Sequence, residues 1–175
     1  MRQYLQLPET EADLPIVFNE FCTTWGVPEE KMIERMANIL VGKGIRYFVI
    51  DAGWFDHVSL DKRTKLGEWE TDEVHFPSGM KHTADIIRKR GMLPGIWFEF
   101  EIVGRDSSTF SLTEHLLKRD GIPITSGNRR FWDMRQSWVQ EYLAEKVIRL
   151  LKECGFSYNK VDYNDTMENH GPIYA

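Results

Sequence analysis

Carboxylates follow the short apolar runs of this chain, and they are the side chains best suited to chemistry. Lys160 precedes Asp162 by two residues, so both side chains should lie on the same face of one strand. Several carboxylates cannot all ionise close together unless a positive charge offsets their repulsion, and Lys160 is the local candidate. Any one acid is equally well explained by an ion pair or a helix cap, so the evidence is their joint placement. The acids are Glu20, Asp51, Glu99, Glu101 and Asp162.

The elements that must position these acids are predicted from hydrophobic periodicity. Apolar runs of strand length, each bounded by polar residues or turn signals, occur at residues 15–20, 47–51, 95–98 and 156–161. Between them, apolar residues recur at helical spacing and end near glycines. These helices are expected at residues 28–40, 80–90 and 139–151, with a weaker one at residues 112–117.

The alternation of strands and helices predicts an α/β fold with a parallel sheet. Neither GxGxxG nor GxxxxGK[ST] occurs, so the phosphate-binding loops of nucleotide-binding open sheets are missing. Polar residues at the ends of all four strands favour a TIM-barrel type of site instead. We therefore expect one domain over residues 1–175, with about four βα units that form half of a (β/α)8 barrel. Its two open sheet edges suggest completion by self-association, as a homodimer or larger homo-oligomer.

Composition excludes several classes of partner. The net charge of -5 and pI near 5.6 give no basic patch for nucleic acid or an anionic membrane. No apolar run reaches the roughly 20 residues that span a bilayer, and the first residues lack a signal pattern. Cys22 and Cys154 lack metal-ligand spacing and are expected to be free thiols, which favours a cytoplasmic location.

Other chemistries have less support in the sequence. The five histidines show no HxxxH or HxH pair, so we predict no transition-metal site and no cofactor, although two or three carboxylates could hold Mg²⁺. No GxSxG elbow is present, and Cys22 has no histidine nearby in sequence. Three tryptophans near strand ends, Trp25, Trp54 and Trp97, could offer flat faces for sugar rings, although most tryptophans are core residues.

Four motifs at the strand ends resemble those of family 36 glycoside hydrolases, the melibiase-like bacterial α-galactosidases of clan D. The motifs appear in that family's order and spacing from about Pro15 to Asp165, which makes coincidence improbable. They are VIDAGWF at residues 49–55, GIWFEFE at 95–101, GNRRFWDM at 127–134 and NKVDYND at 159–165.

The resemblance implies a role for individual residues. Asp162 matches the nucleophile of the Lys-x-Asp-x-Asn motif, which attacks the anomeric carbon and forms a covalent glycosyl-enzyme intermediate in retaining hydrolysis. The expected substrate is a terminal α-galactoside or a related small saccharide. Substrate-binding roles are implied for Asp51, Trp54, Trp97, Glu99, Lys160 and Asn164.

The chain departs from the family pattern at several positions. Many relatives have Trp at Val161, Pro at Phe100 and a second Asp at Ala52, and the last change removes a hydroxyl contact. Relatives carry the acid/base on a later strand and usually an N-terminal β-sandwich domain, neither of which this sequence contains. The isolated chain is therefore expected to be a poor glycosidase that binds sugar without efficient hydrolysis. Substitutes for the acid/base are Glu99, Glu101, Asp133, Asp165 or a second copy.

Overall fold

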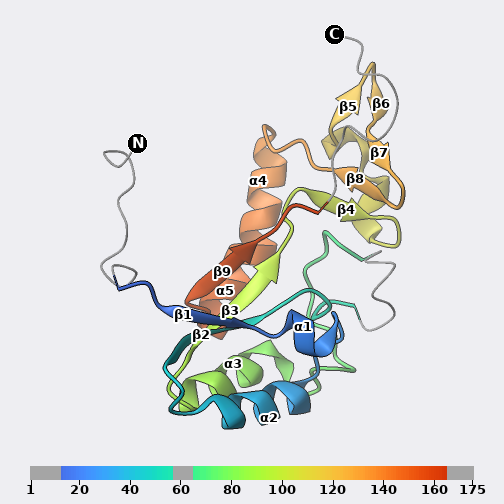
Figure 1. Ribbon diagram of the computed structural model, residues 1–175. Coiled ribbons are helices and arrows are strands. Elements are labelled where there is room, and N and C mark those ends of the chain that lie inside the picture. Colours follow the sequence, from blue (N-terminus) through green and yellow to red (C-terminus); the bar gives the residue numbers. More distant parts are fainter. Residues whose placement is uncertain (1–12, 57–64, 165–175) are drawn as a thin grey trace.

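A parallel four-stranded sheet forms the centre of the protein in the computed structural model, which describes residues 13–56 and 65–164 (Figure 1). Its strands are β1 (Ile16–Asn19), β2 (Ile45–Ile50), β3 (Leu93–Phe98) and β9 (Tyr158–Val161). They lie in the order β1-β2-β3-β9, and every neighbouring pair is parallel. All four predicted strands are confirmed, as is the predicted α/β class with a half-barrel sheet.

Helices connect the parallel strands. After β1 come the single turn α1 (Phe21–Thr24) and α2 (Glu30–Leu40), and α3 (Gly79–Lys89) joins β2 to β3. The helix before β9 is continuous through α4 (Ser137–Leu143), the π-helical turn η5 (Ala144–Ile148) and α5 (Arg149–Cys154). The predictions for α2, α3 and this long helix are confirmed. The described residues thus hold three complete βα units and the strand of a fourth.

An excursion of residues 99–136 separates β3 from α4 and packs as a small antiparallel unit (Figure 1). The helix predicted at residues 112–117 is present only as a 3-10 turn of three residues, Thr113–His115. Leu112 and Leu116 have helical spacing, but Leu116 instead pairs with Trp132 in an antiparallel bridge. The elements of the excursion are β4 (Ile102–Gly104), η3 (Ser108–Ser111), η4 (Thr113–His115), β5 (Lys118–Arg119), β6 (Ile122–Pro123), β7 (Thr125–Ser126) and β8 (Arg129–Phe131).

The two faces of the sheet carry different side chains. One face packs on α2 and α3, where fully buried side chains such as Phe48, Ile50 and Ile96 meet Ile33 and Ala37 in one core. Since side chains alternate along a strand, the neighbouring positions point to the opposite, concave face. That face carries Asp51, Trp97, Lys160 and Asp162. Three of these four side chains are acids or a lysine, and the fourth, Trp97, belongs to the buried core.

Candidate active site

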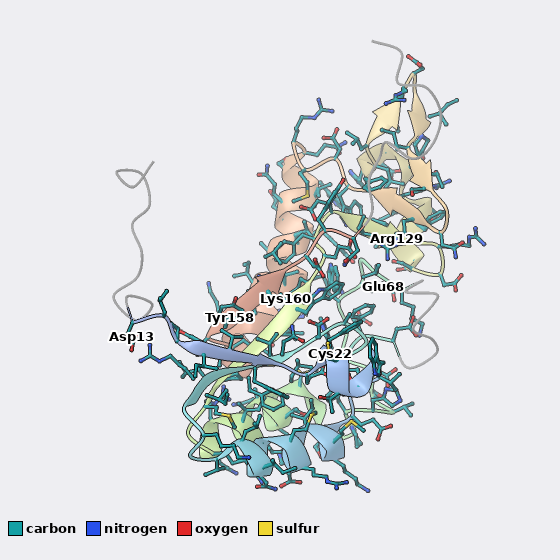
Figure 2. The ribbon with its side chains drawn as sticks, in the orientation of Figure 1. Asp13, Cys22, Glu68, Arg129, Tyr158 and Lys160 are labelled. Atoms are coloured by element: carbon teal, nitrogen blue, oxygen red, sulfur yellow. The ribbon has the colours of Figure 1, made fainter. Side chains whose placement is uncertain are left out.

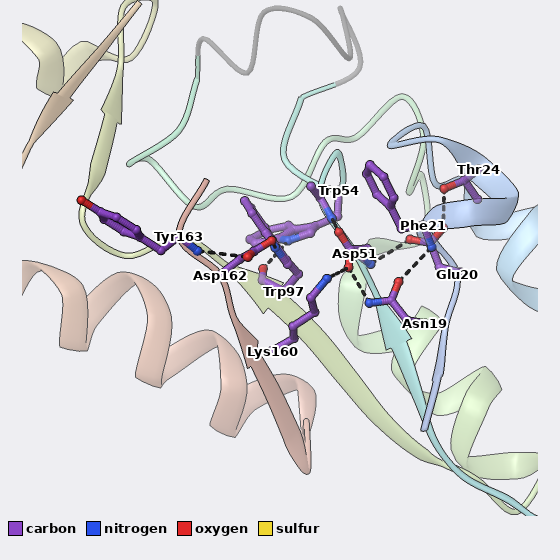
Figure 3. Close-up of polar contacts among 11 residues, drawn as sticks. Asn19, Glu20, Phe21, Thr24, Asp51, Trp54, Trp97, Lys160, Asp162 and Tyr163 are labelled. Carbon is purple, nitrogen blue, oxygen red and sulfur yellow. Dashed lines mark hydrogen bonds and ion pairs between the residues drawn. The ribbon is translucent and has the colours of Figure 1, made fainter. Parts of the chain in front are cut away.

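One acid directly follows each strand of the sheet, so the parallel order brings four acids to one edge. Glu20 follows β1, Asp51 follows β2, Glu99 follows β3 and Asp162 follows β9. Because parallel strands all end on the same side of the sheet, the predicted gathering is found for these four acids, whereas the fifth, Glu101, lines another cavity. Figure 3 shows how Asp51, Asp162 and Lys160 lie over the ends of these strands.

Asp51 accepts hydrogen bonds from three donors on different parts of the chain. Its Oδ2 accepts hydrogen bonds from Lys160 Nζ at 2.7 Å and from Asn19 Nδ2 at 2.6 Å. Its Oδ1 accepts from the backbone N–H of Ala52 at 2.7 Å. The Asp51 side chain is only 3% exposed, so these three donors compensate a carboxylate that has lost most of its water.

Glu20 lies beneath Asp51 and is fully buried. Its Oε1 accepts from the backbone N–H of Asp51 at 2.7 Å, and its Oε2 accepts from the hydroxyl of Thr24. Burial raises the pKa of Glu20 to about 7, and the charge of Asp51 adds to this, while the two hydrogen bonds and Lys160 act against it. Glu20 therefore supports the site from below rather than facing a ligand.

Asp162 is held by groups on both of its carboxylate oxygens. Trp97 Nε1 donates to Oδ2 at 3.0 Å, and the backbone N–H of Tyr163 donates to Oδ1 at 3.0 Å. Burial alone would raise the pKa of Asp162, but these donors, the Asn164 side chain and the charge of Lys160 together hold it below its usual value. Asp162 is therefore ionised at neutral pH, as a carboxylate nucleophile must be.

Two tryptophans at the strand ends are positioned differently from the sequence expectation. The rings of Trp54 and Trp97 are both 0% exposed, so neither offers an open face on which a sugar could stack. Both pack in one aromatic cluster with Phe55 and Trp69. Trp54 Nε1 donates to the Trp97 carbonyl at 2.9 Å, so Trp54 supports the tryptophan that contacts Asp162. Trp25, the third of the predicted tryptophans, is 62% exposed.

Glu99 is fully buried and engaged by the protein itself. Its Oε1 accepts from the backbone N–H of Asn164 at 2.6 Å and lies 3.3 Å from Arg129 Nη1. Arg129 belongs to β8 (Figure 2), so the ion pair ties β8 to the end of β3, and the Asn164 N–H ties Glu99 to the segment that follows Asp162. The structure thus places Glu99 and Asn164 beside Asp162, where they fix the backbone around it.

The other proposed substitutes for the acid/base differ in how they are held. Arg135 lowers the pKa of Asp133 to about 2, so this carboxylate has no proton to give at neutral pH. Glu101 lines a separate cavity of about 340 Å³ beside Tyr163 and Trp132, and its buried Oε2 has no hydrogen-bond partner among the residues described. Asp165 lies outside the described residues. Glu101 therefore stays a prediction.

Two residues of this site were missed in the sequence. In the sequence alone, Asn19 is only part of a strand and Arg129 only part of a motif. A polar residue at the last position of β1 was the available signal for Asn19, and the GNRRFWDM run was the signal for Arg129. Within the described ranges, no group of three or more potential metal ligands occurs, and no helix is long and apolar enough to cross a membrane.

Comparison with known proteins gives a consistent result. A family model described as melibiase matches residues 3–173. Alpha-galactosidase 1 of Pediococcus pentosaceus is 30% identical over 152 residues, which cover 86% of this chain and 21% of the relative. The chain spans about a fifth of the length of the curated relatives it matches.

Solved structures agree with the sequence matches. The GH36 α-galactosidase AgaB of Geobacillus stearothermophilus superposes with a TM-score of 0.81 at 26% identity, covering 96% of this chain and 24% of that one. A variant of AgaA from the same organism, in complex with 1-deoxygalactonojirimycin, gives a TM-score of 0.78 at 26% identity and covers 91% of this chain and 23% of that one.

Proposed function

The chain belongs to the melibiase family, and from this premise we propose that it forms the nucleophile-bearing part of an α-galactosidase active site. Residues 1–175 would be a single partial (β/α)8 catalytic domain. Its substrate would be a terminal α-galactoside, with Asp162 as nucleophile. The related AgaA variant is solved in complex with 1-deoxygalactonojirimycin, a compound named after galactose, which supports the choice of sugar.

One observation carries the proposal: Asp51 follows β2 and Asp162 follows β9 on the same edge of the sheet, and Lys160 interacts with both. Lys160 is bonded to Asp51, and its charge helps to keep Asp162 ionised. Such a group of one cation and two anions offers donors and acceptors to adjacent sugar hydroxyls. The arrangement therefore suits a ligand that carries several hydroxyl groups next to an electrophilic carbon.

The chemistry proposed for Asp162 is the first half of retaining hydrolysis. A carboxylate oxygen of Asp162 bonds to the anomeric carbon while the bond from that carbon to the leaving oxygen breaks. The electron pair goes to the leaving oxygen, which takes a proton from the acid/base. Water then cleaves the glycosyl-enzyme ester in the second half. Trp97 and Tyr163 keep the carboxylate in one orientation, because each donates to a different oxygen.

The test examines the nucleophile independently of the acid/base. With α-galactosyl fluoride, the leaving fluoride needs no proton, so Asp162 alone should suffice to form the covalent adduct. We expect mass spectrometry to find one galactosyl group on the peptide that contains Asp162. Asp162→Asn should abolish it, whereas the matched change Asp133→Asn should leave it in place. Labelling that survives Asp162→Asn would contradict the proposal.

A second candidate function is sugar binding by a self-associated half-barrel. Among the described strands, β1 pairs only with β2 and β9 only with β3, so each has one open edge. Ile16, Val17 and Val161 on these edge strands are 56%, 40% and 54% exposed. A second copy would cover these edges and side chains. Sedimentation should then show a dimer, and a monomer at all concentrations would rule this candidate out.

A further inference from the structure

Glu20 occupies a place in the site that differs from that of the other strand-end acids. Its side chain is 0% exposed, and it contacts the backbone of Asp51 rather than any surface that a ligand could reach. At the same time its own backbone N–H donates to the Val49 carbonyl at 3.3 Å, which extends the β1–β2 pairing by one residue. Glu20 is thus tied to β2 through both its main chain and its side chain.

Burial of the Glu20 carboxyl group costs free energy unless hydrogen bonds compensate the loss of water. A nonpolar side chain at position 20 would avoid the desolvation of a carboxyl group, but it would leave the N–H of Asp51 and the hydroxyl of Thr24 unsatisfied. Both oxygens of Glu20 are used, one for each donor. The contact to Asp51 is the one that bears on a ligand, because it fixes the backbone from which the Asp51 carboxylate projects (Figure 3).

We propose that Glu20 is a positioning residue that holds Asp51 in place and couples sugar binding to its own proton. The inference rests on the proposed function, in which Asp51 binds hydroxyl groups of the galactoside. Glu20 acts only through Asp51 and does not contact the sugar.

The charges around Glu20 determine the direction of the effect. The charged groups that face it are Asp51, directly after β2, and Lys160 on β9, and α1 contributes the neutral hydroxyl of Thr24. When Glu20 loses its proton, its negative charge lies next to the Asp51 carboxylate and makes that carboxylate a stronger hydrogen-bond acceptor. The ionised Glu20 also accepts more strongly from the Asp51 N–H. Sugar binding should therefore tighten as Glu20 ionises.

The pH range of the effect follows from the burial of Glu20. Because burial raises its pKa to about 7, the group changes charge near neutral pH. Galactose should bind about 3-fold to 10-fold more tightly at pH 8 than at pH 6, a range that corresponds to a coupling of about one pK unit or less. By reciprocity, bound galactose should lower the pKa of Glu20 by the same factor.

The test uses the whole chain, labelled with ¹⁵N, and D-galactose as the probe. In the free protein the Asp51 amide resonance should titrate with a midpoint near pH 7, and in Glu20→Gln it should not move in this range. The dissociation constant for galactose should change with pH in the original chain and stay constant in Glu20→Gln. Glutamine keeps the shape and one acceptor oxygen of Glu20 but cannot ionise, so a purely structural role would leave the pH profile unchanged.

A second variant covers the case in which Glu20→Gln does not fold. Thr24→Val removes a hydrogen bond that lowers the pKa of Glu20, so the midpoint of the Asp51 titration should move to higher pH. A wild-type Asp51 amide that does not titrate, a titration that persists in Glu20→Gln, or a midpoint unmoved in Thr24→Val would overturn the role of Glu20. Absence of galactose binding at both pH values would overturn the proposed function and the coupling to sugar with it.

Discussion

Lys160 Nζ lies 2.7 Å from Asp51 Oδ2, although 109 residues separate them in the chain and β3 lies between their strands. Trp97 pairs with Lys160 in the β3–β9 register, and Ile96 pairs with Ile50 one residue before Asp51. The side chains of Asp51, Trp97 and Lys160 therefore form one row across the ends of β2, β3 and β9. Lys160 reaches along this row to a carboxylate that is almost completely buried.

Removal of the lysine should leave the Asp51 charge with less compensation. We expect Lys160→Met to lower the free energy of unfolding by about 1–3 kcal/mol, because Asn19 and the Ala52 N–H still donate to Asp51. Urea denaturation measures the change. Lys152→Met, on the exposed side of α5, is the control and should stay within about 0.5 kcal/mol of the original chain. Equal losses in both variants would mean that the pair contributes nothing.

The glycine in the VIDAGWF motif is required by close packing. Gly53 has a φ of +105°, and a Cβ there would lie 2.0 Å from the carbonyl oxygen of Gly26. Gly53→Ala should therefore cost about 3–5 kcal/mol or prevent folding, since the clash is with backbone atoms. Gly42 has a similar positive φ of +74° but nothing within 4 Å of its Cβ position. Gly42→Ala should cost only about 1–2 kcal/mol by thermal unfolding, and similar costs at both positions would contradict the packing argument.

Much of this fold could be predicted from the sequence because buried parallel strands and amphipathic helices leave strong periodic patterns. The excursion could not be predicted, since strands of two or three residues are too short to show a period. The spacing of Leu112 and Leu116 fits a helix equally well, and only the distant partner Trp132 decides for the bridge. Local patterns therefore identified the sheet and its main helices, but not the unit inserted between them.

The candidate site, like the fold, could be predicted from the sequence only in part. Each acid was predictable because it directly follows a strand, and the topology then determines where it lies. Lys160 is predicted to offset the charge of the acids, but its specific contact with Asp51 is not. Asn19 and Lys160 meet at Asp51 only through the order and register of the strands. The burial of Trp54 likewise depends on Trp69, which arrives from a loop with no periodic signal.

The indole of Trp97 should control the ionisation of Asp162. Trp97→Phe removes the N–H donor to Oδ2 but keeps an aromatic ring in the cluster, so the pKa of Asp162 should rise. A carboxylate with a depressed pKa stabilises the fold above its unfolded pKa, and that stability is lost as pH falls through the folded pKa. In Trp97→Phe, the stability that the ionised Asp162 contributes should therefore be lost at a higher pH than in the original chain.

Carbon-detected NMR of the Asp162 carboxyl group measures the change directly. Trp54→Phe is the matched control, because its indole donates to the Trp97 carbonyl and not to a carboxylate. The pKa of Asp162 should respond to Trp97→Phe and not to Trp54→Phe. A response to both changes of the same size would point to general loosening of the aromatic cluster instead.

The buried carboxyl of Glu20 should make the stability of the fold depend on pH. Its pKa is 4.5 in an ordinary setting and about 7 in the fold, so the folded state keeps a proton that the unfolded chain releases between these values. The stability from this proton is fully present below about pH 4.5 and is lost as pH rises through about 7. The difference of roughly two to three pH units corresponds to about 3 kcal/mol.

Glu20→Gln cannot lose a proton, so relative to the original chain its free energy of unfolding should increase by up to this amount between pH 4.5 and 8. Urea denaturation across this range measures the difference. The exposed Glu73→Gln should show a constant offset, and the same constant offset for Glu20→Gln would mean that Glu20 ionises in the fold as easily as in the unfolded chain.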